Sequence, residues 1–306
     1  MTRTALPAFL SQVALREDCP FVITADLAVP LGLTEFAGLR PDRFLDVGIA
    51  EQFLVASAAG MSSLGLPTIA ITFASFAMRG IEAFRNLVAY DKSHVILIGS
   101  HAGIATGANG PTHHATEDLA MFSSIEGVTC FSPRNFEEAT AAMAFATANH
   151  GQYYVRLARW EPPRSTTPTF LDSVDTEKPW SAKYPKSADC PEILIFSHGI
   201  TWNIACDTVD LLHDAGVVAQ AIHIGKFPFD EDVLKFPKET QLLITLEDHY
   251  SKVGLGRTIS LTAGSTIPHF EIGSKWPLGS DDASVLFDAI GLNANQITIS
   301  ALERIR

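Results

Sequence analysis

The chain has 306 residues, of which 47% are hydrophobic and 18% charged, and its formal net charge at pH 7 is -12. This composition excludes an intrinsically disordered protein, and the acidic balance excludes a nucleic-acid-binding protein, because such proteins present a basic surface. The length predicts about two domains with well-buried cores.

The cysteines and the first residues indicate where the protein resides. Four cysteines lie far apart and form no Cys-x-x-Cys pair: Cys19, Cys130, Cys190 and Cys206. This spacing favours reduced thiols over a disulfide framework or a zinc site. The first residues lack the apolar core of a signal peptide, and no uninterrupted apolar run reaches the roughly 18 residues of a membrane span. We therefore expect a cytoplasmic protein.

Strand-like and helix-like segments alternate through the first half of the chain. Short apolar runs predict strands over residues 21–24, 43–45, 68–72, 94–99, 128–131 and 153–157. Apolar residues at helical spacing predict helices over residues 50–64, 76–90 and 136–148. This βαβ order predicts a doubly wound α/β domain over residues 1–160.

A change of composition separates this half from a second α/β unit. Residues 161–190 are polar, without clear period, and are interrupted by five prolines, which predicts a linker. Alternation then resumes over residues 191–306. Strands are predicted over 192–196, 217–224 and 241–246, a helix over 200–215, and a turn over 254–256.

Glu51 follows the strand predicted at residues 43–45 and lies in the first turn of the next helix. A carboxylate there can simply be a charge that favours the helix dipole. It can also be a proton-handling group, because loops at the carboxyl ends of parallel strands form the ligand crevice of such a sheet. Both interpretations stay open at this point.

Phe73 and Phe76 lie at the next strand end, three residues apart at the start of a helix. Such a pair is usually part of a hydrophobic core. Its position at a strand end also permits an apolar wall for a flat ring.

Residues 100–114 form a long Gly-rich segment after a buried strand and contain three histidines, His101, His113 and His114, together with Asn109. A solvated surface loop and a ligand-binding loop both fit this composition. A metal site is a third interpretation, but the histidines lack the helical i, i+4 spacing that many zinc sites use. We assign no metal ligand in this chain.

Four short motifs occur in order along the chain: Thr24-Ala25-Asp26-Leu27, Asp46-Val47-Gly48-Ile49-Ala50-Glu51-Gln52, Thr72-Phe73-Ala74-Ser75-Phe76 and Gly110-Pro111-Thr112-His113. Together they resemble motifs of the thiamine-diphosphate enzymes that include transketolase and deoxyxylulose-phosphate synthase. The resemblance implies a pyrimidine-binding domain over residues 1–160 and a transketolase C-terminal domain over residues 191–306.

The resemblance implies roles on the cofactor side. In that family the matching glutamate hydrogen-bonds N1′ of the cofactor's aminopyrimidine ring, so Glu51 is expected to control the tautomer of that ring. Phe73 and Phe76 match the aromatic pocket around the pyrimidine. Asp26 matches an acidic residue close to the cofactor.

The resemblance also implies roles on the substrate side. His101 and His113 match catalytic histidines of the transketolase substrate channel, and Asn109 lies where a donor-sugar hydroxyl is contacted. Arg159 matches an arginine that binds the sugar phosphate, and Arg3 falls where a second one would lie. Arginine suits this role because its guanidinium group makes bidentate contacts with oxyanions.

Several positions depart from the transketolase pattern. Pro30 replaces a phosphate-binding serine and supplies no hydroxyl. Ala108-Asn109-Gly110 replaces Glu-Asp-Gly, so a carboxylate becomes an amide that keeps hydrogen-bonding capacity without charge. His114 replaces the usual glutamine. These departures leave the identity of the donor ketose open.

The diphosphate end of the cofactor needs a further domain, which in this family starts with Gly-Asp-Gly and holds a divalent metal through oxygen ligands. No Gly-Asp-Gly occurs in these 306 residues. The chain therefore resembles the C-terminal half of a split transketolase. We expect a partner subunit that supplies the diphosphate site with Mg²⁺ or Ca²⁺, in an α2β2 heterotetramer.

The expected reaction is transfer of a two-carbon ketol unit from a ketose, or ketose phosphate, to an aldehyde. One alternative is a subunit of the 2-oxo-acid E1 β type or of the deoxyxylulose-phosphate-synthase type. Another is a non-catalytic regulatory subunit, although the retention of Glu51 argues against it.

Overall fold

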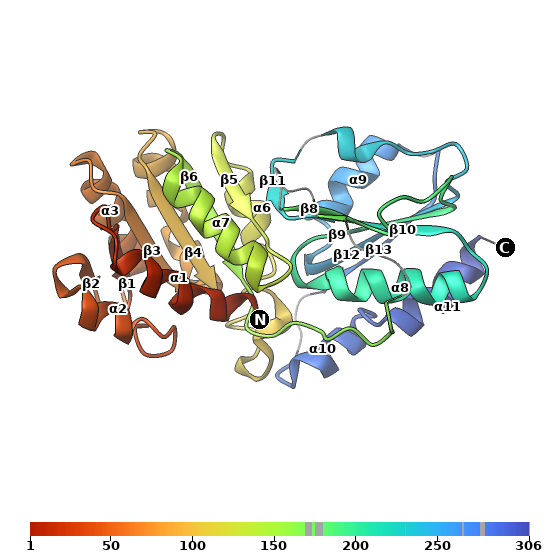
Figure 1. Cartoon of the computed structure of the whole chain (residues 1–306), viewed down its shortest axis with the longest axis horizontal. Coiled ribbons are helices and arrows are strands. Elements are labelled where there is room, and N and C mark those ends of the chain that lie inside the picture. The colour runs from red at the N-terminus through yellow and green to blue at the C-terminus, as the bar shows by residue number, and fades with distance from the viewer. Residues whose placement is uncertain (169–172, 175–179, 230, 265, 276–278, 306) are drawn as a thin grey trace.

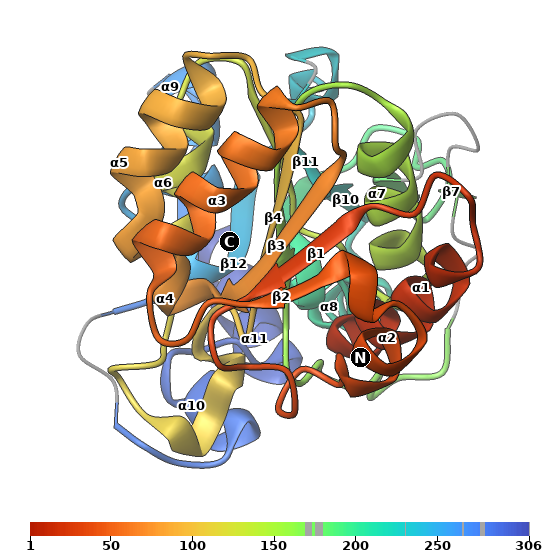
Figure 2. The same cartoon turned by 90° about the vertical axis from the view of Figure 1, so that its left-hand side faces the viewer.

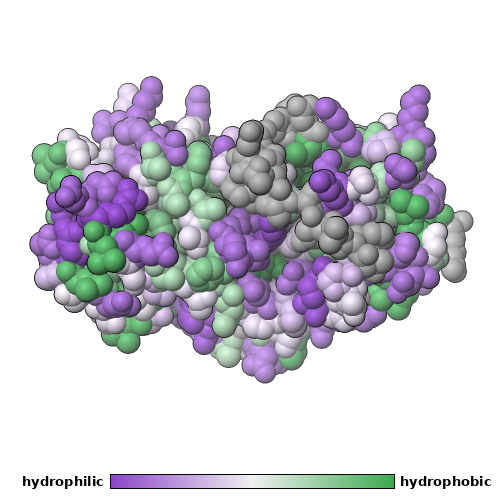
Figure 3. Space-filling view, viewed as in Figure 1, coloured by the Kyte–Doolittle hydropathy of each residue, from purple (hydrophilic) through white to green (hydrophobic). Residues whose placement is uncertain are grey.

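The structure is a computed structural model that describes residues 1–168, 173–174, 180–229, 231–264, 266–275 and 279–305. Two sheets lie side by side along the long axis of the molecule, each with helices on both faces (Figure 1). This confirms the predicted α/β class with two doubly wound units. On the face drawn in Figure 3, hydrophilic and hydrophobic residues are interspersed. Within the described ranges, no helix has both the length and the apolarity to cross a bilayer.

The first sheet has the strand order β11-β5-β6-β4-β3-β1-β2. Its parallel strands are β1 (Phe21–Thr24), β2 (Phe44–Asp46), β3 (Thr68–Phe73), β4 (Val95–Ser100), β5 (Val128–Phe131) and β6 (Gln152–Leu157). Every residue of β3, β4 and β6 is buried, which explains why these strands are continuous runs rather than alternating ones. The short β11 (Lys226–Phe227) pairs antiparallel with β5.

Helices cover both faces of this sheet, as Figure 2 shows end-on. Their bounds are α1 (Ala5–Ala14), α2 (Thr34–Leu39), α3 (Glu51–Ser63), α4 (Ala74–Ala77), α5 (Ile81–Ala83), α6 (Asp118–Ser123) and α7 (Phe136–Ala148). Short 3₁₀ segments are η1 (Thr2–Thr4), η2 (Pro41–Arg43), η3 (Met78–Gly80) and η5 (Ile104–Asn109). Helix α7 begins where predicted, because the Asn135 side chain accepts the Glu138 N–H at 2.9 Å.

The segment predicted as one helix over residues 76–90 is helical through residue 89, but it is not one continuous α-helix. The chain forms α4, η3, α5 and then the π-helical η4 (Phe84–Ala89). The interruption falls at Gly80, where a Cβ would lie 2.7 Å from Val55 Cγ2 and 3.2 Å from the Glu51 carbonyl oxygen. Close packing against α3 therefore requires glycine at this point, and glycine weakens a helix interior.

The second sheet has the order β13-β12-β9-β10-β8-β7. Its strands are β7 (Ser173–Val174), β8 (Ser181–Tyr184), β9 (Ile193–Ser197), β10 (Ala219–Ile224), β12 (Leu242–Tyr250) and β13 (His269–Ser274). Its helical segments are η6 (Gly199–Thr201), α8 (Trp202–Asp214), η7 (Glu231–Leu234), α9 (Leu255–Ala263), α10 (Ala283–Ala289) and α11 (Ala294–Arg304).

The segment expected to be a linker contributes to this sheet. Strand β8 pairs antiparallel with β10, and the buried Tyr184 hydroxyl donates to Asp210 at 2.6 Å. Residues 169–172 and 175–179 of the expected linker lie outside the described residues. The domain boundaries at 160 and 190 stay a prediction.

Two local expectations in the second unit are corrected. Strand β12 continues through residues 247–249, and residues 254–256 open α9 rather than form a turn. Helix α9 starts here because the buried Glu247 carboxylate accepts hydrogen bonds from the N–H groups of Leu255, at 2.6 Å, and Gly256, at 2.8 Å. A carboxylate in this position satisfies two donors at a helix N-terminus.

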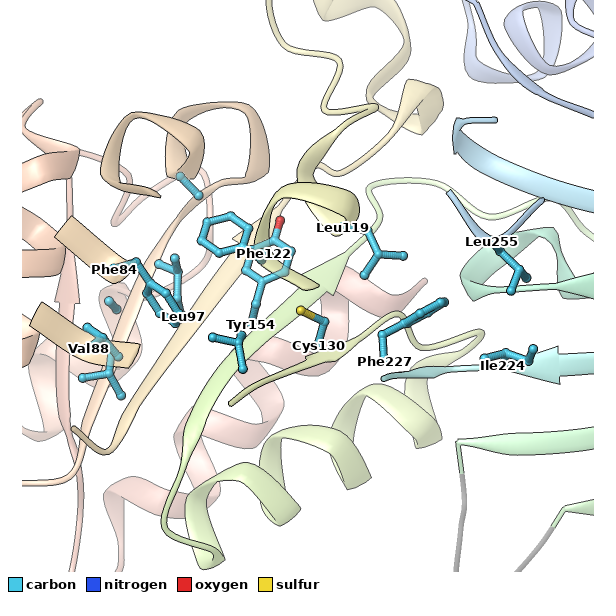
Figure 4. Packing of buried hydrophobic residues seen from close by; sticks show 14 of the residues in the cluster. Phe84, Val88, Leu97, Leu119, Phe122, Cys130, Tyr154, Ile224, Phe227 and Leu255 are labelled. Atoms are coloured by element: carbon cyan, nitrogen blue, oxygen red, sulfur yellow. The ribbon is translucent and has the colours of Figure 1, made fainter. Parts of the chain in front are cut away.

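One apolar cluster runs from the first sheet into the second (Figure 4). Phe84 packs edge-on against Phe122, which stacks on Tyr154 at a centroid distance of 4.1 Å. The cluster continues through Cys130 to Phe227 and Leu255. The two units therefore share a core, so side chains of the second unit can brace loops of the first.

Candidate active site

The carboxyl ends of the parallel strands meet at one edge of the first sheet. Register pairs such as Thr24↔Asp46, Phe73↔Ser100 and Ser100↔Leu157 place the strand ends together. Each strand end carries or precedes a residue singled out from the sequence: Asp26, Glu51, Phe73, His101 and Arg159. This is the edge at which open α/β sheets bind ligands.

Glu51 is the first residue of α3, and only 4% of it is exposed. Its carboxylate accepts a hydrogen bond from Arg79 Nη1 at 3.2 Å, and the Arg79 side chain is 59% exposed. The Arg79 guanidinium also lies 5.2 Å from the centre of the Phe76 ring. Arg79 thus joins the buried carboxylate to the aromatic pair. The sequence analysis did not single out Arg79 as a site residue. Its spacing of three residues from Phe76 places it one helical turn further on, which is the signal that could have identified it.

Four rings form a single cluster next to this pair. The Phe73 and Phe76 ring centres are 5.4 Å apart. His101 lies 4.1 Å from Phe73, and His113 lies 5.3 Å from Phe76. Phe73 is buried, whereas Phe76 and His113 are half-buried. The cluster brings together residues from β3, α4 and the segment after β4. Residues 101–110 of that segment are called the 101–110 loop below.

His101 is held in an uncommon backbone conformation with φ +58°. Its Nδ1 lies 3.0 Å from Ser100 Oγ, and its Nε2 accepts a hydrogen bond from Arg3 Nη1 at 3.4 Å. Burial, helped by the charges of Arg3, Arg159 and the neighbouring His113, lowers the pKa of His101 to about 3. The imidazole is therefore neutral at physiological pH, with one ring nitrogen as a hydrogen-bond donor and the other as an acceptor.

Arg3 and Arg159 place two guanidinium groups beside this neutral histidine. Burial and the nearby Arg159 lower the pKa of Arg3 from its ordinary value. The Arg3 N–H donates to the Ala158 carbonyl at 3.1 Å, so this N-terminal residue is anchored to the strand end. Arg159 Nη1 donates to Asn109 Oδ1 at 2.6 Å. Two neighbouring cations suit an anionic group.

The remaining candidates lie apart from the rings. Asp26 is exposed, has φ +57°, and its N–H donates to the Asp46 carboxylate at 2.9 Å. His114 is buried, and its Nε2 donates to the Gly107 carbonyl at 3.2 Å, which braces the 101–110 loop. Pro30 is exposed. For the part of the chain that the structure describes, no contact joins Asp26 to the ring cluster.

The residues present fit an aminopyrimidine ring. Phe73 and Phe76 offer an apolar wall, and the Glu51 carboxylate offers a buried acceptor for a ring N–H. No group of three or more His, Cys, Asp or Glu side chains that could hold a metal ion occurs among the described residues.

Comparisons with known proteins find similarity to transketolases and to a related synthase. The family model "Transketolase, pyrimidine binding domain" matches residues 1–163. A putative transketolase C-terminal section of Methanocaldococcus jannaschii is 29% identical over 78% of this chain and 74% of that protein. A 6-deoxy-6-sulfo-D-fructose transketolase subunit of a Clostridium species is 28% identical over 96% of this chain and 91% of that subunit.

A solved structure described as a split gene transketolase, inactive beta4 tetramer, has a TM-score of 0.82 and 27% identity. The match covers 99% of this chain and 98% of that one. The 1-deoxy-D-xylulose-5-phosphate synthase of Tropheryma whipplei is 30% identical over 90% of this chain, which corresponds to 42% of that enzyme.

Proposed function

The chain belongs to the transketolase family, and we propose that it is a subunit of a thiamine-diphosphate-dependent transferase that moves a two-carbon ketol unit from a ketose to an aldehyde. Family membership supports a transferase-type enzyme in general. The observation that carries the finer proposal is the cluster at the sheet edge, where buried Glu51 and the Phe73–Phe76 pair adjoin neutral His101.

Thiamine diphosphate supplies the nucleophilic carbon for such a transfer when it is bound. In the proposed site, the Glu51 carboxyl group would hydrogen-bond N1′ of the aminopyrimidine ring and share a proton with it. Phe73 and Phe76 hold the ring in place and exclude water from it. Asp26 is proposed to contact the cofactor through its exposed side chain.

On the substrate side, His101 and His113 are proposed to exchange protons with substrate oxygens. His101 is neutral at physiological pH, so its ring can present both a hydrogen-bond donor and an acceptor to a substrate oxygen. Asn109 is proposed to contact a donor hydroxyl, and the cations Arg3 and Arg159 a terminal anion of the substrate. The similarity to a subunit named for a sulfonated fructose supports an anionic terminus that is either a phosphate or a sulfonate.

A separate subunit is proposed to hold the diphosphate end of the cofactor and its Mg²⁺ or Ca²⁺, in an α2β2 complex. The similarity over the whole chain to a split gene transketolase, and to proteins named as a C-terminal section and a subunit, supports this arrangement. Large exposed apolar side chains also belong to or adjoin α3 and η4: Ile49, Phe53, Leu64, Leu87 and Tyr90. An exposed apolar surface of this kind is typical of an interface.

The proposal is tested by assaying the chain together with a Gly-Asp-Gly-containing partner against ketoses with and without a terminal phosphate. The expected products are an aldehyde shortened by two carbons and a ketose lengthened by two carbons from the acceptor. Formation should require thiamine diphosphate and a divalent cation. Release of CO₂ from pyruvate without ketose cleavage would instead establish a second candidate, a deoxyxylulose-phosphate-synthase-like or 2-oxo-acid E1 β-type subunit, which the similarity to the Tropheryma enzyme favours.

A non-catalytic regulatory subunit is the remaining candidate function. It predicts that the complex has the same activity whether or not this chain carries its buried carboxylate.

Arg159→Ala is expected to raise KM for a phosphorylated donor by about 10- to 100-fold, because a charge-assisted hydrogen bond contributes roughly 1.5–3 kcal/mol. KM for the same donor without phosphate should change much less. Steady-state kinetics with both donors measures this difference. Arg43→Ala is the control, since Arg43 precedes β2 at the opposite edge of the sheet. An equal loss with both donors would show that Arg159 does not bind the anion.

A further inference from the structure

Asp248 lies on β12 of the second sheet, and its side chain is fully buried against the 101–110 loop of the first unit. Its Oδ1 accepts the Ile104 N–H at 2.7 Å, across 144 positions of sequence. No partner within the described residues lies at its Oδ2. A buried carboxylate with one oxygen unpaired is costly to keep, so its retention calls for a compensating role.

The fit between Asp248 and the loop is close. Gly103 has φ +67°, and a Cβ on this residue would collide with the Asp248 carboxylate. Only glycine adopts that backbone conformation without strain and leaves the space that the carboxylate occupies. The Gly103 N–H donates to the Ala115 carbonyl at 2.9 Å, which closes the base of the loop.

A buried ion pair fixes the same junction. Arg156 of β6 bonds to Asp118 at 3.0 Å and also donates to the carbonyl oxygens of Ala115 and Asp248. The strand that carries Asp248 is therefore tied to the base of the loop through its backbone as well as its side chain.

The far end of the loop is also held by the second unit. Helix α10 packs on η5, and Ser280 Oγ donates to the Ala108 carbonyl. Asp248 at one end and the start of α10 at the other thus bracket the segment from Gly103 to Asn109. Asn109, the last residue of this segment, contacts Arg159, and His101, two residues before its start, contacts Arg3.

We propose that Asp248 is a positioning residue, which holds the 101–110 loop so that His101 and Asn109 meet the substrate in one geometry. What the loop contacts rests on the proposed function, whereas the holding of the loop by Asp248 does not. The second unit would then hold in place the loop that forms the substrate side of the active site.

The first test needs no turnover and uses amide hydrogen exchange of the full chain. Asp248→Ala should speed exchange over residues 103–109 by at least about tenfold, because it removes the buried acceptor of the Ile104 N–H. Asp248→Asn keeps a carbonyl acceptor and should restore protection. Glu247→Ala is the matched control, since Glu247 is equally buried on the same strand but bonds the start of α9. Unchanged exchange of the loop in Asp248→Ala would overturn the proposal.

The second test uses the complex with its partner, below the unfolding temperature of each variant. Asp248→Ala should lower kcat/KM for the ketose donor by about 100-fold, the order expected from a small misplacement of reacting groups. The thiamine diphosphate concentration that gives half-maximal activity should stay within about threefold, because the loop lies on the substrate side. Asp248→Asn should recover most of the activity.

Donor kinetics that stay unchanged in an Asp248→Ala variant with a mobile loop would also overturn the positioning role. A wild-type complex that cleaves no ketose would contradict the proposed function alone. The exchange experiment would still decide whether Asp248 holds the loop.

Discussion

Glu51→Gln is expected to lower kcat of the reconstituted complex by about 10²- to 10⁴-fold, the range supplied by a positioned proton-transfer group. The glutamine amide keeps the size of the side chain and its hydrogen-bonding capacity but cannot hold the shared proton. KM for the ketose should change little, because Glu51 is proposed to act on the cofactor and not on the ketose. Steady-state kinetics at saturating thiamine diphosphate measures both constants.

If Glu51 were only a charge at a helix start, its substitution would affect activity no more than that of another such residue. Glu35 is an exposed acidic residue in the first turn of α2, so Glu35→Gln removes a comparable helix-dipole interaction without touching the site. That interaction contributes only about 0.3–1 kcal/mol, and activity should be unaffected. Equal activity losses in the two variants, or full activity of Glu51→Gln, would show that Glu51 has no catalytic role.

Without its partner, the isolated chain is expected to show no turnover above background. The reason is that these 306 residues contain no Gly-Asp-Gly motif for the diphosphate and its metal. Activity should rise in proportion to added partner and level off at an equimolar ratio. Activity titrations, with the molar mass of the complex measured in parallel, check the α2β2 stoichiometry. Robust turnover by the isolated chain would contradict the split-enzyme proposal.

The apolar surface around α3 allows a sharper test of the same idea. Phe53→Asp should weaken assembly by at least about tenfold, since it places a charge where an apolar side chain would be buried at the interface. Ile299→Asp is the matched control, because Ile299 is 60% exposed and Phe53 is 59% exposed, but Ile299 lies on α11 at the far end of the molecule (Figure 1). Equal assembly of both variants would place the interface elsewhere.

Local sequence signals predicted most elements of the fold. The strand at residues 128–131 and the helix at residues 136–148 have the predicted bounds, since continuous apolar runs and an asparagine cap are local features. The segment predicted as one helix over residues 76–90 changes helix type around Gly80, which packs closely against α3. Residues 254–256 likewise became a helix start through the distant Glu247.

The sequence by itself determined the α/β class, the family resemblance and the candidate residues at successive strand ends. It could do so because parallel strands bring their carboxyl ends to one edge, so motif order translates into proximity. Only the tertiary structure decided which candidates touch. The Arg3–His101 bond spans 98 positions and the Ile104–Asp248 bond spans 144, and no local pattern encodes such pairings. The neutral state of His101 has the same origin, because it depends on burial and on two arginines that only the folded chain brings beside it.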